Sequence, residues 1–120
     1  MIIAVDFDGT IVEHEFPEIG KEKEGAFATL LKLKKAGHKL ILWTCRNDND
    51  TALNGRKVLT EAVDFCAANG LVFDAVNDNI EGIGFYPYPK MFADVYIDDR
   101  AMWNCGFHVD WNMVSRRLGI

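Results

Sequence analysis

Acidic residues follow two apolar segments that lie far apart in the sequence. Asp6 and Asp8 end the first segment, and Asp98 and Asp99 end a later one. Four carboxylates around one crevice repel each other, so they need protons or a cation to coexist. Hard oxygen ligands without a cluster of His or Cys favour magnesium over zinc. Magnesium keeps some waters and binds a substrate phosphate beside one or two carboxylates, so this pattern suits phosphoryl transfer.

Other residues near these acids could hold a phosphate group. Gly9 permits a tight turn in which backbone N–H groups face an anion. Thr44 follows a third apolar segment and offers a hydroxyl group and neighbouring N–H groups. Lys90 lies upstream of the last acidic segment and could neutralise both the acids and the phosphate. Considered singly, Thr44 is more often a structural residue and Lys90 a solvated one.

The first acidic motif could also belong to a calcium-binding loop. Such a loop has an acid or Asn at its fifth position and Glu at its twelfth. Counted from Asp6, those positions hold Thr10 and Pro17, so the calcium loop is excluded. Two nearby side chains are less informative. His14 could reach a substrate but is more typical of an exposed loop, and Cys45 has no sequence neighbour that favours a thiolate nucleophile.

The elements that must position these residues alternate along the chain. Apolar runs predict strands, and apolar positions at helical spacing predict helices. Strands are expected at residues 2–6, 39–44, 72–76 and 93–98, with a short one near Phe107, and helices at residues 21–36, 55–68 and after Asp110. The alternation predicts an α/β fold, a three-layer Rossmann-like sandwich with a mainly parallel central sheet. Ligands bind beyond the carboxyl ends of such strands, so the acidic segments and Thr44 should meet there.

The composition narrows the class of protein. With 120 residues, 49% of them hydrophobic, the chain is expected to form one domain over residues 1–120. No apolar run approaches the roughly 18 residues of a bilayer span, and the N-terminus lacks a signal peptide, so we expect a cytoplasmic protein without a membrane partner. Three widely spaced cysteines fit a reducing compartment. The net charge of -5 argues against broad nucleic-acid binding but allows nucleotides, because a metal ion can supply positive charge.

Taken together, the polar segments resemble the motifs of the haloacid dehalogenase-like (HAD) hydrolase superfamily. All four motifs occur in the family's order and span nearly the whole chain, which makes the resemblance specific. The matching residues are Asp6-Phe7-Asp8-Gly9-Thr10 for the first motif, Thr44 for the second, Lys90 for the third, and Tyr96-Ile97-Asp98-Asp99 for the fourth. The segments between the motifs are too short for a separate cap domain, so the chain is similar to a small, capless member.

The resemblance implies a magnesium-dependent phosphatase that hydrolyses a phosphate monoester. Asp6 would attack phosphorus and form an aspartyl-phosphate. Asp8 would protonate the leaving oxygen and then deprotonate the water that hydrolyses the intermediate. Magnesium would be held by Asp6, the backbone carbonyl of Asp8, and Asp98, and Asp99 would assist directly or through water.

The resemblance also implies how the substrate is held. Thr44, the N–H of Cys45, and Lys90 would bind the phosphoryl oxygens, and Arg46 could bind the rest of the substrate. The expected substrate is a phosphorylated small molecule or a nucleotide. Without a cap the site would be open, unless a bulky phosphorylated partner, a second subunit of a homo-oligomer, or the aromatic loop at residues 85–89 covers it.

Three alternatives stay open at this stage. A receiver-like signalling domain also clusters Asp, Thr and Lys around magnesium, but its lysine follows its last acid, whereas Lys90 precedes Asp98. Its phospho-acceptor would also end a middle strand, whereas Asp74 lies within the third predicted strand. A phosphotransferase of the same superfamily would use the same residues. A catalytically silent member is not favoured, because all four motifs are complete.

Overall fold

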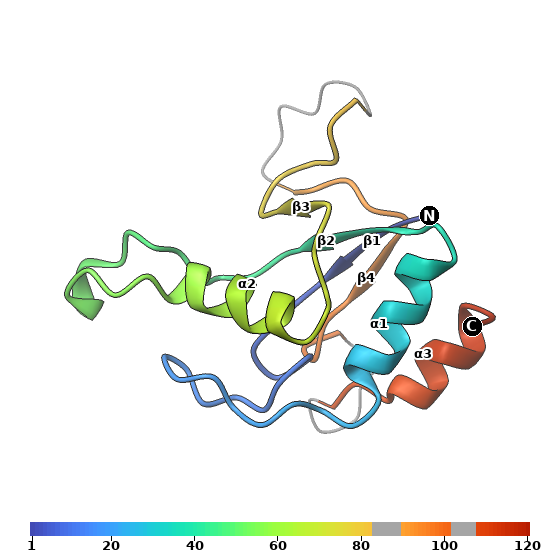
Figure 1. The fold of residues 1–120 in the computed structure, drawn as a ribbon, viewed down its shortest axis with the longest axis horizontal. Coiled ribbons are helices and arrows are strands. Elements are labelled where there is room, and N and C mark those ends of the chain that lie inside the picture. The colour runs from blue at the N-terminus through green and yellow to red at the C-terminus, as the bar shows by residue number, and fades with distance from the viewer. Residues whose placement is uncertain (83–89, 102–107) are drawn as a thin grey trace.

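In the part of the chain that the structure describes, four short parallel strands form a sheet (Figure 1). The computed structural model describes residues 1–82, 90–101 and 108–120. Within them the strands are β1 (Ile2–Val5), β2 (Lys39–Leu42), β3 (Ala75–Val76) and β4 (Val95–Ile97), in the spatial order β3-β2-β1-β4. Every pairing is parallel, and Ile3 lies opposite Leu40 on one side and Val95 on the other. The predicted Rossmann-like α/β fold is confirmed. The strand predicted near Phe107 lies outside the described residues.

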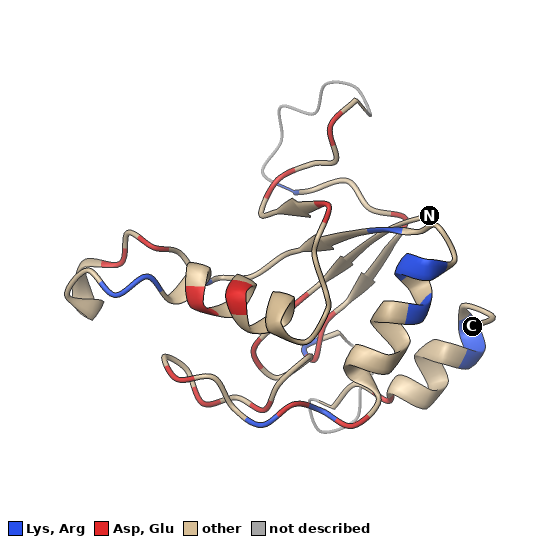
Figure 2. Cartoon of the chain, viewed as in Figure 1, with Lys and Arg blue, Asp and Glu red and all other residues tan. Residues whose placement is uncertain are grey.

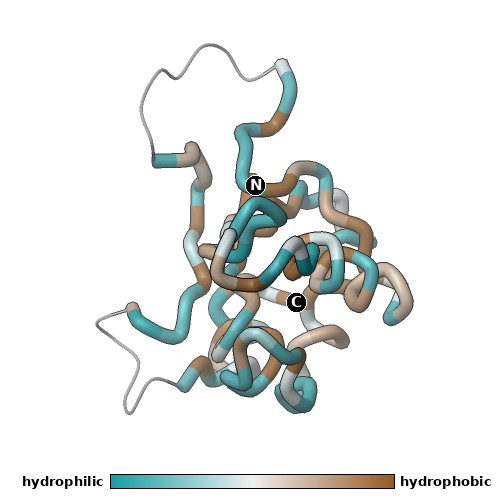
Figure 3. Tube along the Cα trace, turned by 90° about the vertical axis from the view of Figure 1, so that its left-hand side faces the viewer, coloured by the Kyte–Doolittle hydropathy of each residue, from teal (hydrophilic) through white to brown (hydrophobic). Residues whose placement is uncertain are grey.

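Three helices supply most of the apolar cover. They are α1 (Ala26–Lys35), α2 (Val58–Ala68) and α3 (Trp111–Arg117), and a 3₁₀ turn η1 (Thr51–Leu53) precedes α2. Hydrophobic residues recur between hydrophilic ones along the chain (Figure 3), and each of these helices has buried residues beside more exposed ones. Basic residues occupy the last turns of α1 and α3, where they interact favourably with the carboxyl end of a helix (Figure 2). None of the described helices is long and apolar enough to cross a lipid bilayer.

The two faces of the sheet are covered differently. One face packs against all three described helices in a core that contains Ile3, Val5, Leu40 and Leu42 with Leu30, Ala62, Cys66 and Trp111. Truncation of a fully buried residue of this kind to Ala typically costs about 2–5 kcal/mol. The other face carries Ala4 and Ile41, which pack with Ala93, Trp43 and Tyr96. In the described part of the chain, irregular segments cover this second face.

A hairpin follows the first acidic motif and shortens the first predicted helix. Its arms pair through the N–H of Glu13, which donates to Lys21 O at 2.7 Å, and the N–H of Lys23, which donates to Ile11 O at 2.8 Å. The helix predicted over residues 21–36 therefore starts only at Ala26. A Cβ on Gly20 would lie 2.2 Å from the carbonyl oxygen of Glu13, so only glycine fits there. Residues 11–23 are called the hairpin below.

The segment before α2 also differs from the prediction. The expected helix over residues 55–68 begins at Val58, and a stretch rich in Asn and Asp precedes it. Asp48 in that stretch accepts the N–H groups of Leu59 at 2.9 Å and Thr60 at 3.0 Å. It therefore caps the start of α2 from a distance in sequence, a role that local spacing did not reveal.

Candidate active site

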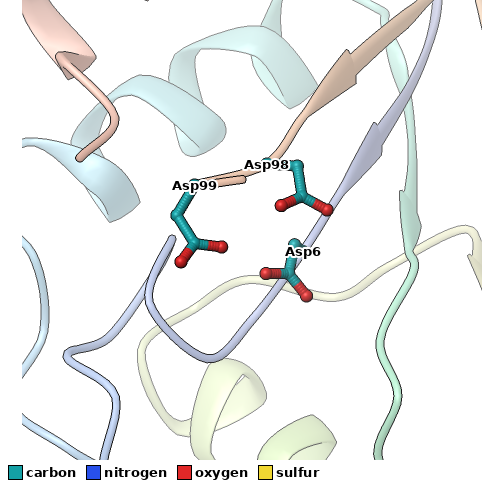
Figure 4. Close-up of side chains that lie close together, drawn as sticks. All are labelled: Asp6, Asp98 and Asp99. Atoms are coloured by element: carbon teal, nitrogen blue, oxygen red, sulfur yellow. The ribbon is translucent and has the colours of Figure 1, made fainter. Parts of the chain in front are cut away.

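Three carboxylates meet at the carboxyl ends of the neighbouring strands β1 and β4 (Figure 4). One oxygen from each of Asp6, Asp98 and Asp99 lies within 4.8 Å of the other two. The N–H of Asp6 donates to Ile97 O at 3.0 Å, so the parallel pairing continues one residue past β1 and fixes Asp6 beside the end of β4. Burial and the negative charge of Asp98 raise the pKa of Asp6 to about 8. The chain thus brings together three of the four acids that the sequence predicted to converge, whereas the carboxylate of Asp8 lies outside this cluster.

Thr10 connects the two chain segments that supply this acidic cluster. Its hydroxyl lies 3.2 Å from a carboxylate oxygen of Asp6 and 3.4 Å from one of Asp99, and it accepts the N–H of Asp99 at 2.9 Å. Gly9 has a φ of 83°, and a Cβ there would lie 2.4 Å from Asp99 Oδ2. The indole N–H of Trp111 donates to the carbonyl of Thr10 at 3.1 Å. Small residues and a hydroxyl therefore let the two acidic segments approach closely.

Asp8 is held by Arg46. The guanidinium donates from Nε and Nη2 to the two carboxylate oxygens of Asp8, each at 2.8 Å. The side chain of Arg46 is 0% exposed and that of Asp8 is 13% exposed. The sequence had suggested that Arg46 could bind substrate, but in the structure its guanidinium donates its hydrogen bonds to acceptors of the protein itself. The carboxylate of Asp8 does not belong to the acidic cluster. The contact of its backbone carbonyl with a metal ion stays a prediction.

Asn77 holds the loop after β2, although it was not among the predicted site residues. Its Oδ1 accepts the N–H of Thr44 at 2.8 Å, and its Nδ2 donates to Arg46 O at 3.4 Å. The hydroxyl of Thr44 accepts the N–H of Arg46 at 3.1 Å. Asn77 has a φ of 49°, a region that Asn tolerates better than most residues. Its position directly after the third strand, like that of Thr44 after the second, is the signal that could have identified it.

A pocket of about 390 Å³ opens over the acidic cluster. It is lined by Asp6, Asp8, His14, Phe16, Thr44, Cys45, Arg46, Asp98, Asp99 and Arg100. His14 and Phe16 come from the tip of the hairpin, and Phe16 is 41% exposed. The hairpin thus forms part of the pocket wall. His14 lines the pocket, in agreement with the suggestion from the sequence that it could reach a substrate.

Lys90 is placed differently from the prediction. Its Nζ lies 4.9 Å from the centre of the Tyr96 ring, and it is not among the residues that line the pocket. Successive residues of a strand point to opposite faces, so Tyr96 packs with Ala4 and Ile41 while Ile97 enters the helix-covered core. Lys90 follows Tyr96 to that second face. In this structure the predicted phosphate site therefore consists of Thr44 and its neighbours without Lys90.

Asp74, the residue weighed as a receiver-like phospho-acceptor, lies at the opposite end of the sheet. It precedes β3, forms an ion pair with Lys34 at 2.9 Å, and accepts the N–H of Leu40 at 2.8 Å. These contacts give it a structural role and leave the cluster around Asp6 as the candidate for chemistry.

Comparison with known proteins gives one informative result. No protein-family model and no curated protein matches the chain. A solved structure described as the "Structure of the conserved protein coded by locus from Bacteroides thetaiotaomicron" matches with a TM-score of 0.82 and 40% sequence identity. The match covers 99% of this chain and 89% of that one, so the likeness extends over both chains rather than a shared fragment. The chain therefore belongs to the same family as this conserved protein from Bacteroides thetaiotaomicron.

Proposed function

We propose that the protein is a magnesium-dependent phosphatase of the HAD-like type, which hydrolyses phosphate monoesters through an aspartyl-phosphate on Asp6. The observation that carries the proposal is the approach of Asp6, Asp98 and Asp99 to within 4.8 Å of one another in the lining of a pocket. Carboxylates held this close are costly to the fold unless a proton or a cation compensates them. Such costly arrangements of acids are typical of functional sites.

The donor set of the cluster fits magnesium. Asp6, Asp98 and Asp99 offer only carboxylate oxygens, the ligand type that Mg²⁺ prefers. Bound there, the ion would neutralise negative charge on the acids and on the substrate phosphate. The raised pKa of Asp6, caused by burial and by Asp98, is a second sign that the site accommodates a cation.

The chain's own residues supply the chemical steps. A carboxylate oxygen of Asp6 attacks phosphorus while the bond from phosphorus to the leaving oxygen breaks. The leaving oxygen keeps the electron pair of that bond and takes a proton from Asp8, which enters this step protonated. Thr10 orients the attacking carboxylate through its hydroxyl, 3.2 Å away. In the second step a water attacks phosphorus and gives a proton to Asp8. The bond from phosphorus to Asp6 then breaks, which releases phosphate and restores the carboxylate.

The pocket defines the substrate class in this proposal. Thr44 and the N–H of Cys45 hold the phosphoryl oxygens, since both residues line the pocket beside Asp6. A volume of about 390 Å³ suits a phosphorylated metabolite or a nucleotide, whose leaving group would lie against His14 and Phe16. The proposal includes a cytoplasmic location, in line with the free thiols of Cys45 and Cys66. A homo-oligomer that covers the site remains part of the same proposal.

The test is turnover of para-nitrophenyl phosphate by the full chain with and without magnesium. We expect EDTA to abolish turnover, magnesium to restore it, and Asp6→Asn to lower kcat by a factor on the order of 10⁴ or more. Asp64→Asn is the matched control, because Asp64 is an exposed residue of α2 that does not line the pocket. Turnover that survives in Asp6→Asn, or that needs no metal, would contradict the proposal.

A further inference from the structure

Arg46 is a charged residue in the interior of the protein. Among the described residues it is the largest fully buried side chain. Removing a guanidinium from water is costly unless every donor finds an acceptor and the charge finds a partner. Its five N–H groups match five hydrogen bonds to protein acceptors, and one residue, Asp8, takes two of them.

The acceptors of Arg46 belong to three separate parts of the chain. Besides the carboxylate of Asp8, they are the carbonyls of Pro17 at 3.3 Å and Glu18 at 2.9 Å in the hairpin, and of Val58 at 3.1 Å at the start of α2. A planar guanidinium has its donors in fixed directions, so the position of one acceptor restricts the others. Asp8 is therefore connected through one rigid group to the tip of the hairpin.

Two aromatic rings fix the plane of the guanidinium. The centres of the Phe7 and Phe16 rings each lie 5.1 Å from Cζ of Arg46, within the range of a cation–π contact. Phe7 is buried in the core, whereas Phe16 is partly exposed and lines the pocket. Arg46 therefore aligns Asp8 and also supports the side chain against which a leaving group would lie.

We propose that Arg46 is a positioning residue that holds the carboxyl group of Asp8 beside the leaving group, where it gives up a proton in the first step and takes one back from water in the second, and that it ties this placement to the hairpin tip. The inference rests on the proposed function, because it assigns Arg46 a part in that reaction. A bidentate pair fixes both oxygens of Asp8, which a lysine with a single ammonium group does not reproduce.

The test compares two aryl phosphates in the full chain with magnesium. Para-nitrophenolate leaves easily without a proton, whereas phenolate needs one, so only the second reports on the acid. We expect Arg46→Lys to lower kcat on phenyl phosphate by about 10²-fold and on para-nitrophenyl phosphate much less, with little change in KM. In an Asp8→Asn background the same substitution should add little, because two residues that act as a unit are not additive.

Arg56→Lys is the matched control. Arg56 also binds the hairpin tip, through the carboxylate of Glu18, and it pairs with Glu61, but its side chain is 34% exposed and it does not contact Asp8. This variant should leave the ratio of the two kcat values unchanged. A merely structural Arg46 would lower both rates equally, in the wild-type and Asp8→Asn backgrounds alike, and that result would overturn the proposal.

A second measurement does not depend on whether Arg46→Lys folds. A crystal structure of the wild-type protein with magnesium and beryllofluoride on Asp6 should show Asp8 still paired with Arg46. An Asp8 that has left Arg46 in this complex would overturn the positioning role. Failure of the proposed function is distinct, because then the wild-type protein would hydrolyse neither ester and beryllofluoride would not bind Asp6.

Discussion

Aspartates lie at both ends of the parallel sheet, and their surroundings differ in kind. At the amino end, Asp74 binds Lys34 and the N–H of Leu40, and Asp94 accepts the N–H of Ile2 at 2.7 Å. Although burial acts to raise it, the Leu40 N–H and Lys34 together keep the pKa of Asp74 below its ordinary value. These acids satisfy backbone donors at the sheet edge, so the fold itself accounts for them.

At the carboxyl end the acids face one another instead. Burial and Asp98 raise the pKa of Asp6 to about 8. A hydrogen bond from the N–H of Phe7 acts to lower this pKa but offsets only part of the rise. The pairing at the amino end thus keeps the pKa of Asp74 low, whereas the crowding of acids at the carboxyl end raises that of Asp6, although Asp98 there accepts the N–H of Arg100 at 2.8 Å. This difference is the physical basis for our proposal that the chemistry takes place at the carboxyl end.

The largest expected effect separates an acid of the cluster from an acid of the amino end. We expect Asp98→Asn to raise the magnesium concentration for half-maximal turnover by a factor on the order of 10². The reason is that a carboxylate ligand is replaced by a neutral amide. Asp94→Asn should leave that concentration unchanged, because Asp94 binds a backbone N–H far from the pocket. Equal magnesium dependence in the two variants would remove the distinction between the two ends.

A smaller effect is expected from the close approach of the two acidic segments. Gly9→Ala places a Cβ 2.4 Å from Asp99 Oδ2 at a φ of 83°, which combines a clash with backbone strain. We expect a loss of about 1–3 kcal/mol in the free energy of unfolding and weaker magnesium binding. Denaturant titration and magnesium-dependent turnover measure the two. Gly37→Ala is the control, since its φ of 92° is similarly strained but no atom lies within 4 Å of the added Cβ.

The sequence predicted the acidic cluster because parallel strands that end in acids must deliver them to the same edge. It did not predict where Lys90 lies, since a residue in an irregular segment is not placed by strand periodicity. The buried pairing of Arg46 with Asp8 was also missed, because an arginine after a strand is usually exposed. Its partners Pro17 and Val58 are distant in sequence, and only the folded hairpin brings them together.

Hydrophobic spacing gave the helices but not their boundaries. Along α1 the structure buries Leu30 and Leu33 but leaves Leu31 36% exposed, so not every apolar residue of this helix faces the core. The early start predicted for this helix failed because residues 21–23 pair with the other arm of the hairpin. Pairing between segments overrides a local helical pattern, and a single sequence does not display such pairing.

The smallest expected effect concerns the stability of the metal-free protein as a function of pH. The pKa of Asp6 is raised from 3.8 to about 8, so between these values the folded protein keeps a proton that the unfolded chain has lost. The free energy of unfolding should therefore fall as the pH rises toward 8. Linkage at 1.36 kcal/mol per unit sets an upper limit of roughly 6 kcal/mol. Solvent in the pocket should reduce the observed change to about 1–2 kcal/mol.

Denaturant titrations in EDTA between about pH 5 and pH 8 measure this slope. Asp6→Asn should flatten it, and saturating magnesium should flatten it in the wild-type protein, because the ion binds the ionised carboxylates. Asp74→Asn provides the contrast from the other end of the sheet. The pKa of Asp74 is lowered, so its contribution is fully present above its ordinary value and is lost only in stronger acid. This variant should lose a constant amount of stability between pH 5 and pH 8 and keep the wild-type slope. A wild-type slope that persists in Asp6→Asn would mean that the repulsion between the acids at the carboxyl end does not lower the free energy of unfolding.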